Sequence, residues 1–86
     1  MTRTLALSMR PGDVFDPKAM TIDKGDTVTV TNRDLNVHNW TDSGVFSSGD
    51  LTPRGTSSYT FRLAGTFRYE CTIHVDMGMT GVITVR

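Results

Sequence analysis

The chain has 86 residues, which is enough for one domain and too few for a second hydrophobic core. Nine basic residues balance nine acidic ones, so no bulk charge favours nucleic acid or an anionic membrane as a partner. The single cysteine excludes an internal disulfide, and no apolar run is long enough for a transmembrane segment or a signal peptide. We therefore expect a single domain over residues 1–86, with a monomer as the default.

The composition favours β structure. Thr, Val and Ile account for 25 of the 86 residues, and their branched side chains favour extended backbone. Strong helix formers are scarce, with three Ala, five Leu and one Glu. Eight Gly and three Pro interrupt the chain at short intervals, which is typical of an all-β protein with several short strands.

Apolar and polar residues alternate in the first third of the chain. Leu5, Leu7 and Met9 are separated by polar or small neighbours, and residues 20–22 repeat the pattern. Val and Thr then alternate through residues 27–31. The Asp-Lys-Gly-Asp sequence between these last two segments predicts a hairpin turn.

The alternation returns in the last third. Tyr59, Phe61 and Leu63 are expected to share one face, and residues 67–71 and 81–85 predict two further strands. Residues 32–58 are less regular, with one strand expected near His38 and long loops after it. Strands with one apolar face bury it by packing sheet on sheet, so the sequence predicts an all-β sandwich of about seven to eight strands.

One short segment concentrates the residues that carry chemistry. Cys71, His74, Met77 and Met79 fall within nine residues, and the second histidine, His38, lies 33 residues before the cysteine. A thiolate, two imidazoles and a thioether form a soft ligand set, which favours copper over Mg²⁺ or Ca²⁺ and matches the blue-copper type of site. Zinc is a weaker alternative, because structural zinc sites prefer more thiolates and do not need methionine.

Three motifs along the chain are informative in combination. They are Val37–Asn39, the Gly-x-Phe-x-Tyr-x-Cys pattern of Gly65–Cys71, and the Cys-x-x-His spacing that continues through Met79-x-Gly81. In combination they resemble the cupredoxins, which are small blue-copper proteins of the plastocyanin, amicyanin and halocyanin kind. The resemblance extends from about residue 14 to residue 86, and it implies a Greek-key β-sandwich.

The resemblance also implies a metal site with one copper ion that alternates between Cu(I) and Cu(II). Carried over by position, its ligands are His38, Cys71, His74 and Met79. Asn39 is expected to tie the segment of the first histidine to the cysteine loop by a hydrogen bond that holds the ligand geometry.

The methionine ligand has two candidates. Met77 gives the Cys-x2-His-x2-Met spacing of amicyanin-like loops, and Met79 gives the Cys-x2-His-x4-Met spacing of plastocyanin-like loops. Only Met79 stands two residues before Gly81, where the final strand of the family begins. We therefore expect Met79 to be the ligand and Met77 to pack or lie on the surface.

The function implied by the resemblance is that of a type 1 copper protein, which carries single electrons between transient redox protein partners and is not an enzyme. The surface around His74 is the expected point of contact, and the family favours a periplasmic or other extracytoplasmic location. Two alternatives use the same ligands: a copper carrier or buffer without electron transfer, and the copper domain of a larger oxidoreductase. An enzyme with Cys71 as nucleophile is disfavoured, because no oxyanion-hole motif or orienting group is evident.

Overall fold

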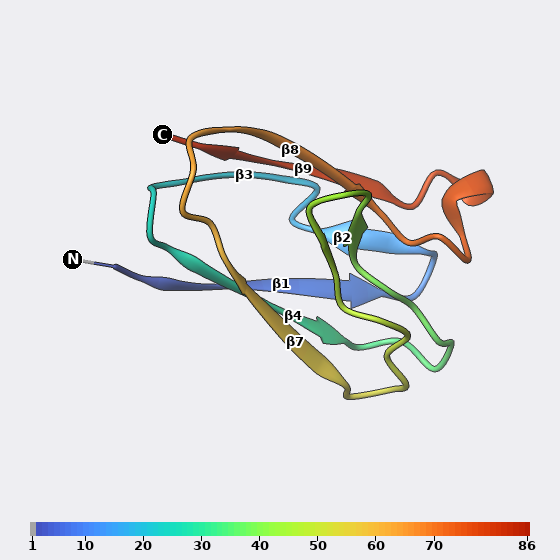
Figure 1. The fold of residues 1–86 in the computed structure, drawn as a ribbon. Helices are drawn as coiled ribbons and strands as arrows, with labels where there is room; N and C mark the ends of the chain where they lie inside the picture. Colours follow the sequence, from blue (N-terminus) through green and yellow to red (C-terminus); the bar gives the residue numbers. More distant parts are fainter. Residues whose placement is uncertain (1) are drawn as a thin grey trace.

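The computed structural model describes residues 2–86, and within them it contains nine strands and one short 3-10 helix (Figure 1). The elements in chain order are β1 Thr4–Arg10, β2 Val14–Asp16, β3 Ala19–Ile22, β4 Thr27–Asn32, β5 Thr41–Asp42, β6 Phe46–Ser47, β7 Thr56–Thr60, β8 Gly65–Glu70, η1 Val75–Met77 and β9 Thr80–Val85. Two sheets face each other, with strand orders β2-β1-β4-β7 and β3-β9-β8-β5-β6. The predicted all-β sandwich is confirmed, and its strand number is close to the expected seven to eight.

Two pairs of strands that are distant in the sequence run parallel. β1 pairs with β4, and β3 pairs with β9, whereas the other strand pairs are antiparallel. Parallel neighbours need a long connection, and here that connection passes through the opposite sheet. The prediction of a hairpin at Asp23–Asp26 is therefore wrong, because this turn joins β3 of one sheet to β4 of the other.

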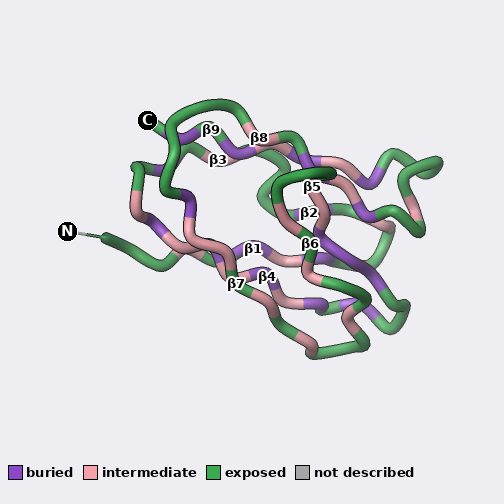
Figure 2. The backbone as a smooth tube through the Cα atoms, in the orientation of Figure 1, coloured by how far each residue is buried: buried purple, intermediate pink, exposed green. Residues whose placement is uncertain are grey.

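The apolar faces of both sheets form one core. Side chains alternate between buried and accessible along β4, where Val28 and Val30 are fully buried, and Figure 2 shows the same alternation along several strands. The buried hydrophobic residues are Leu7, Met9, Phe15, Ile22, Val28, Val30, Trp40, Phe61, Tyr69, Cys71, Met79, Ile83 and Val85. Leu63, expected on the inner face, is 73% exposed because β7 ends at Thr60 and the chain then crosses to the other sheet.

A buried carboxylate closes the end of the sandwich where β1 starts and the chain ends at Arg86. Asp26 is 1% exposed and accepts backbone N–H groups from Asp23 and Arg3, each at 2.9 Å. The guanidinium of Arg3 adds contacts of 2.9 and 3.2 Å. The backbone hydrogen bond from Asp23 and then the bonds from Arg3 lower the pKa of the Asp26 carboxyl to about 2.

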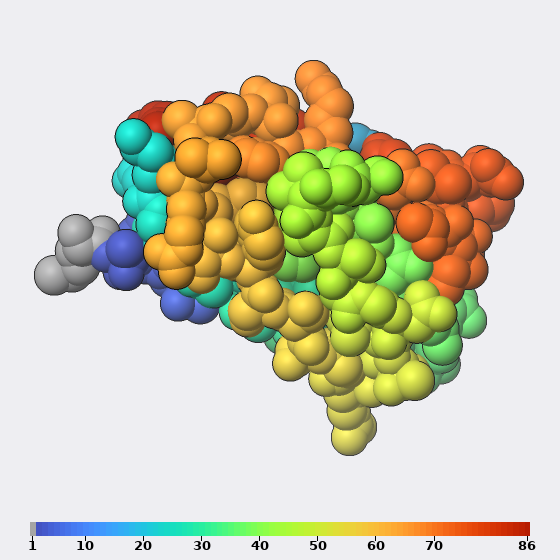
Figure 3. Space-filling view, in the orientation of Figure 1, coloured from blue at the N-terminus to red at the C-terminus, as the bar shows by residue number. Residues whose placement is uncertain are grey.

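The loops that carry the candidate metal ligands lie at the other end. The β1–β2 turn, the chain between β4 and β5, and the segment from β8 to β9 all approach this end (Figure 1). In the space-filling view, the orange-red atoms of the β8–β9 segment lie opposite the blue N-terminal residues (Figure 3). Within residues 2–86, no helix has the length and apolar character required to cross a membrane.

Candidate metal centre

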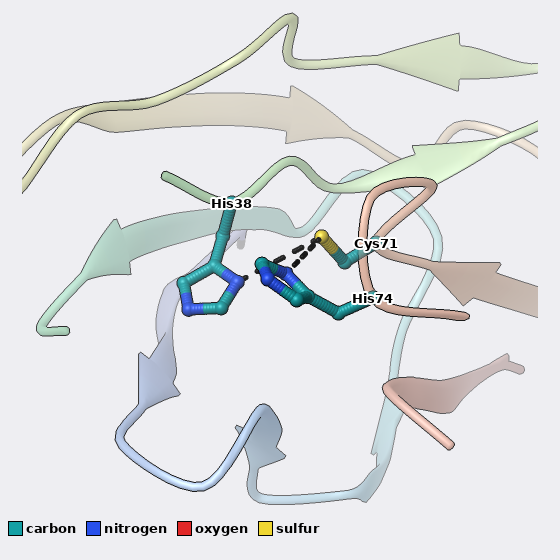
Figure 4. A group of neighbouring side chains, drawn as sticks. All are labelled: His38, Cys71 and His74. Atoms are coloured by element: carbon teal, nitrogen blue, oxygen red, sulfur yellow. Dashed lines mark hydrogen bonds between the residues drawn. The ribbon is translucent and has the colours of Figure 1, made fainter. Parts of the chain in front are cut away.

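Two histidines and the only cysteine meet at this end of the sandwich (Figure 4). The Nδ1 atoms of His38 and His74 lie 3.7 and 3.5 Å from the Sγ atom of Cys71. All three potential ligand atoms lie within 4.8 Å of one another. The fold thus brings together residues that are as much as 33 positions apart in the sequence.

These spacings fit a single metal ion. An ion about 2.3 Å from a sulfur and about 2.0 Å from a nitrogen separates the two atoms by about 3.5–3.7 Å at tetrahedral or trigonal angles. Both sulfur-to-nitrogen distances fall in this range. A soft sulfur with two imidazole nitrogens is also the donor set that copper prefers, so both the geometry and the chemistry of these residues fit the expected ion.

His38 is fixed from two sides. Its backbone exchanges hydrogen bonds of 3.2 and 2.7 Å with Leu51 in an isolated bridge, whereas the strand expected here begins only at Thr41. On the side-chain side, Nε2 lies 2.8 Å from Oδ2 of Asp34, and both residues are buried. A hydrogen bond donated by Nε2 leaves the lone pair of Nδ1 facing Cys71. The same hydrogen bond lowers the pKa of the Asp34 carboxyl.

The segment after β8 folds back on itself through backbone hydrogen bonds. Cys71 donates to the carbonyl of Met79 at 3.1 Å, and His74 donates to the carbonyl of Cys71 at 3.1 Å. Gly78, with a φ of 81°, ends η1 in the left-handed conformation and lets the chain turn back. The side chain of Met79 is fully buried, whereas Met77 is 71% exposed. Burial therefore favours Met79 as the candidate thioether ligand.

Asn39 connects the two halves of the centre. Its backbone N–H points at the Sγ atom of Cys71, at 3.4 Å. Its side chain accepts the N–H of Thr72 at 3.0 Å and donates to the Thr72 hydroxyl at 2.8 Å. A further hydrogen bond of 3.1 Å runs to Asp50. These hydrogen bonds connect the two segments that the family resemblance implied Asn39 would join.

Two acidic residues near the histidines were not predicted as part of the site. Asp34 contacts His38 as described, and Oδ1 of Asp13 lies 4.0 Å from Nε2 of both His38 and His74. Asp13 occupies the β1–β2 turn with a φ of 58°. The only sequence signal was the position of Asp34 four residues before His38, and Asp13 lies outside the segment that carries the family motifs.

The three converging residues differ in their access to solvent. Cys71 and His38 are 0% exposed, whereas the His74 side chain is 21% exposed. Exclusion of water strengthens electrostatic interactions with a bound ion. The edge of His74 is thus the part of the cluster that reaches the surface.

The sandwich and the soft nitrogen-sulfur cluster define a small copper-binding β protein. A family model described as "Copper binding proteins, plastocyanin/azurin family" matches residues 6–86, so the chain belongs to this family and is a cupredoxin that binds one copper ion. A plastocyanin from Scenedesmus fuscus is 34% identical, and the match covers 85% of this chain and 87% of that protein.

Solved structures agree with this assignment. A purple cupredoxin from Nitrosopumilus maritimus superposes with a TM-score of 0.86 at 25% identity, covering 95% of this chain and 99% of that one. The reduced Cu(I) form of an amicyanin point mutant at pH 4 gives a TM-score of 0.85 at 27% identity, covering 96% of this chain and 82% of that one. The family resemblance inferred from the motifs is confirmed.

Proposed function

We propose that this cupredoxin is a blue-copper electron carrier in which His38, Cys71, His74 and Met79 bind the ion. The observation that carries the proposal is the convergence of the buried Cys71 thiol with the Nδ1 atoms of both histidines. The burial of Met79, and its backbone hydrogen bonds with Cys71 and His74, support it as the fourth ligand.

Each residue has a defined role in this proposal. A bound copper ion supplies one-electron chemistry by changing between Cu(II) and Cu(I). Cys71 provides the strongly covalent thiolate, and the N–H of Asn39 stabilises negative charge on its sulfur. His38 is held by Leu51 and Asp34, so its ring has little freedom to move when the oxidation state changes. A rigid ligand frame keeps the reorganisation that accompanies each electron small.

Electrons are proposed to enter and leave through the partly exposed edge of His74. The apolar residues that flank it in the sequence, Ile73, Val75 and Met77, are exposed by 48%, 36% and 71%. An apolar surface of this kind suits brief contacts with a redox protein, which must dissociate after each transfer. The carrier makes no covalent change to its partner. An extracytoplasmic location is proposed on the basis of the family alone.

The test is spectroscopic. Metal-free protein is titrated with Cu(II), and its optical and electron paramagnetic resonance spectra are recorded, followed by voltammetry. We expect one equivalent of copper, an intense thiolate-to-copper band that is absent in Cys71→Ser, and a reversible one-electron wave. A wild-type protein that binds copper without the band or the wave would favour the copper carrier or buffer instead.

A further inference from the structure

The outer nitrogen of His38 faces a buried carboxylate. Its Nε2 atom lies 2.8 Å from Oδ2 of Asp34, which is only 7% exposed. The other carboxylate oxygen accepts the N–H of Leu35 at 2.7 Å. Both oxygens of Asp34 are therefore engaged, one by the backbone of its own loop and one by the candidate ligand.

A second buried side chain fixes the loop that presents this carboxylate. Asn32 is 0% exposed, and its Oδ1 accepts the N–H of Asp34 at 2.9 Å. Its Nδ2 donates to the carbonyls of Asn36 and Leu51, each at 2.8 Å. Leu51 is also the backbone partner of His38. One hydrogen-bond network thus holds both the carboxylate and the imidazole, so the fold itself fixes the contact between them.

A second carboxylate, that of Asp13, lies near both histidines. Oδ1 of Asp13 lies 4.0 Å from Nε2 of His38 and 4.0 Å from Nε2 of His74. Its side chain is 19% exposed, about as accessible as that of His74. In the part of the chain that the structure describes, the basic side chains within 4.0 Å of the carboxylates of Asp13 and Asp34 are those of these two histidines alone. Among residues 2–86, no lysine or arginine therefore neutralises the two negative charges within ion-pair distance.

We propose that Asp34 and Asp13 lower the reduction potential of the metal centre. They place two negative charges, which no lysine or arginine of the described chain pairs with, next to the Nε2 atoms of its histidine ligands. The proposal rests on the proposed function, since it takes His38 and His74 as copper ligands. Oxidation of Cu(I) to Cu(II) releases one electron to the redox partner and adds one positive charge to the centre. Nearby negative charge stabilises the more positive state, and it does so most strongly where water is excluded. Asp34 is in addition a positioning residue for His38, because it accepts the Nε2–H and makes Nδ1 a stronger donor.

The test compares copper-loaded Asp34→Asn and Asp13→Asn with the wild-type protein at pH 7 and fixed ionic strength. We measure the reduction potential by voltammetry and the affinities for Cu(II) and Cu(I) separately. In Asp34→Asn we expect the ratio of Cu(II) to Cu(I) affinity to fall about tenfold, which raises the potential of this one-electron couple by about 59 mV. In Asp13→Asn the shift has the same sign and is smaller, because the carboxylate is farther away and more exposed.

Two further variants separate charge at the site from other effects. Asp76→Asn removes the same charge from an exposed position on η1, where solvent screens it, and should leave the potential close to wild type. Asp34→Glu keeps the charge and should retain more of the wild-type potential than Asp34→Asn. If Asp34→Asn fails to fold, Asp13→Asn alone tests the charge effect, and a potential equal to that of Asp76→Asn then overturns the proposal.

Two results of these measurements would contradict the charge effect. The proposal is overturned if both asparagine variants have the potential of Asp76→Asn, or if they weaken Cu(II) and Cu(I) binding equally, as a purely structural role would. Failure of the proposed function is a different result, because the wild-type protein itself would then lack the thiolate-to-copper band.

Discussion

The side chain of Asn39 is hydrogen-bonded to Thr72 in both directions. Its Oδ1 accepts the Thr72 N–H at 3.0 Å, and its Nδ2 donates to the Thr72 hydroxyl at 2.8 Å. This pair joins the chain that follows His38 to the residue that follows Cys71. Because the two segments are 33 residues apart, the Asn39–Thr72 pair fixes a long-range contact next to the cluster of donor atoms.

Replacing this amide should therefore loosen the site. Asn39→Ala removes both hydrogen bonds to Thr72 together with those to Asp50 and from the Thr41 hydroxyl. Each such bond contributes about 0.5–1.5 kcal/mol, so the loss should be about 2–6 kcal/mol. We expect urea denaturation of the metal-free protein to show a loss of this size, together with a broadened copper spectrum. The exposed Asn36→Ala is the matched control, and equal stability of the two variants would contradict the assigned role.

The two methionines of the β8–β9 segment should respond differently to leucine. Met79→Leu removes a buried thioether donor, so Cu(II) loses a weak ligand and the reduction potential should rise, with a change in the copper spectrum. The similar volumes keep the cost to folding below about 1.5 kcal/mol. Met77→Leu, at an exposed position, should leave both readouts near wild type. The opposite pattern would reassign the ligand to Met77.

Gly81 is expected to tolerate no side chain. It pairs with Tyr69 across β8 and β9, and a Cβ atom added to it would lie 2.6–2.7 Å from the tyrosine ring and hydroxyl. Gly81→Ala should lower the free energy of unfolding by about 1–3 kcal/mol, as overpacking does. A double-mutant cycle with Tyr69→Leu tests the cause, since a coupling energy below about 0.5 kcal/mol would show that the ring is not responsible.

Asp26 predicts a pH dependence of stability. Its folded pKa of about 2 lies below its usual value of 3.8, so its contribution to stability is present above pH 4 and is lost as the pH falls from about 4 towards 2. We expect Asp26→Asn to unfold at lower urea than wild type at pH 7. The difference should shrink over that acidic interval. A difference that is constant with pH, or that Asp76→Asn reproduces, would contradict this linkage.

The sandwich was predictable because short strands with one buried face leave a period of two in the sequence. Leu7, Met9, Val28 and Val30 follow this pattern and are buried. The parallel pairing of β1 with β4 was not predictable, because it joins strands that are not consecutive in the sequence and leaves no local signal. For the same reason, the turn residues at 23–26 indicate a change of direction but not which sheet the next strand joins.

The candidate site also has a part that the sequence predicts and a part that it does not. The spacing from Cys71 to Met79 is local, so the sequence displays it directly. The roles of Asp34 and Asp13 depend on which loops meet at the end of the sandwich, and an aspartate in a loop is usually solvated. Only the folded chain distinguishes these two residues from the other acidic residues.

The arrangement of the chain ends has a practical consequence. The start of β1 and the C-terminal Arg86 lie at one end of the sandwich, and the β8–β9 segment lies at the other (Figure 1). Arg86 is fastened there by backbone hydrogen bonds to Ile22 and Lys24. A tether, a fused domain or a solid support joined to Arg86 would therefore leave the metal-binding end facing away from the attachment.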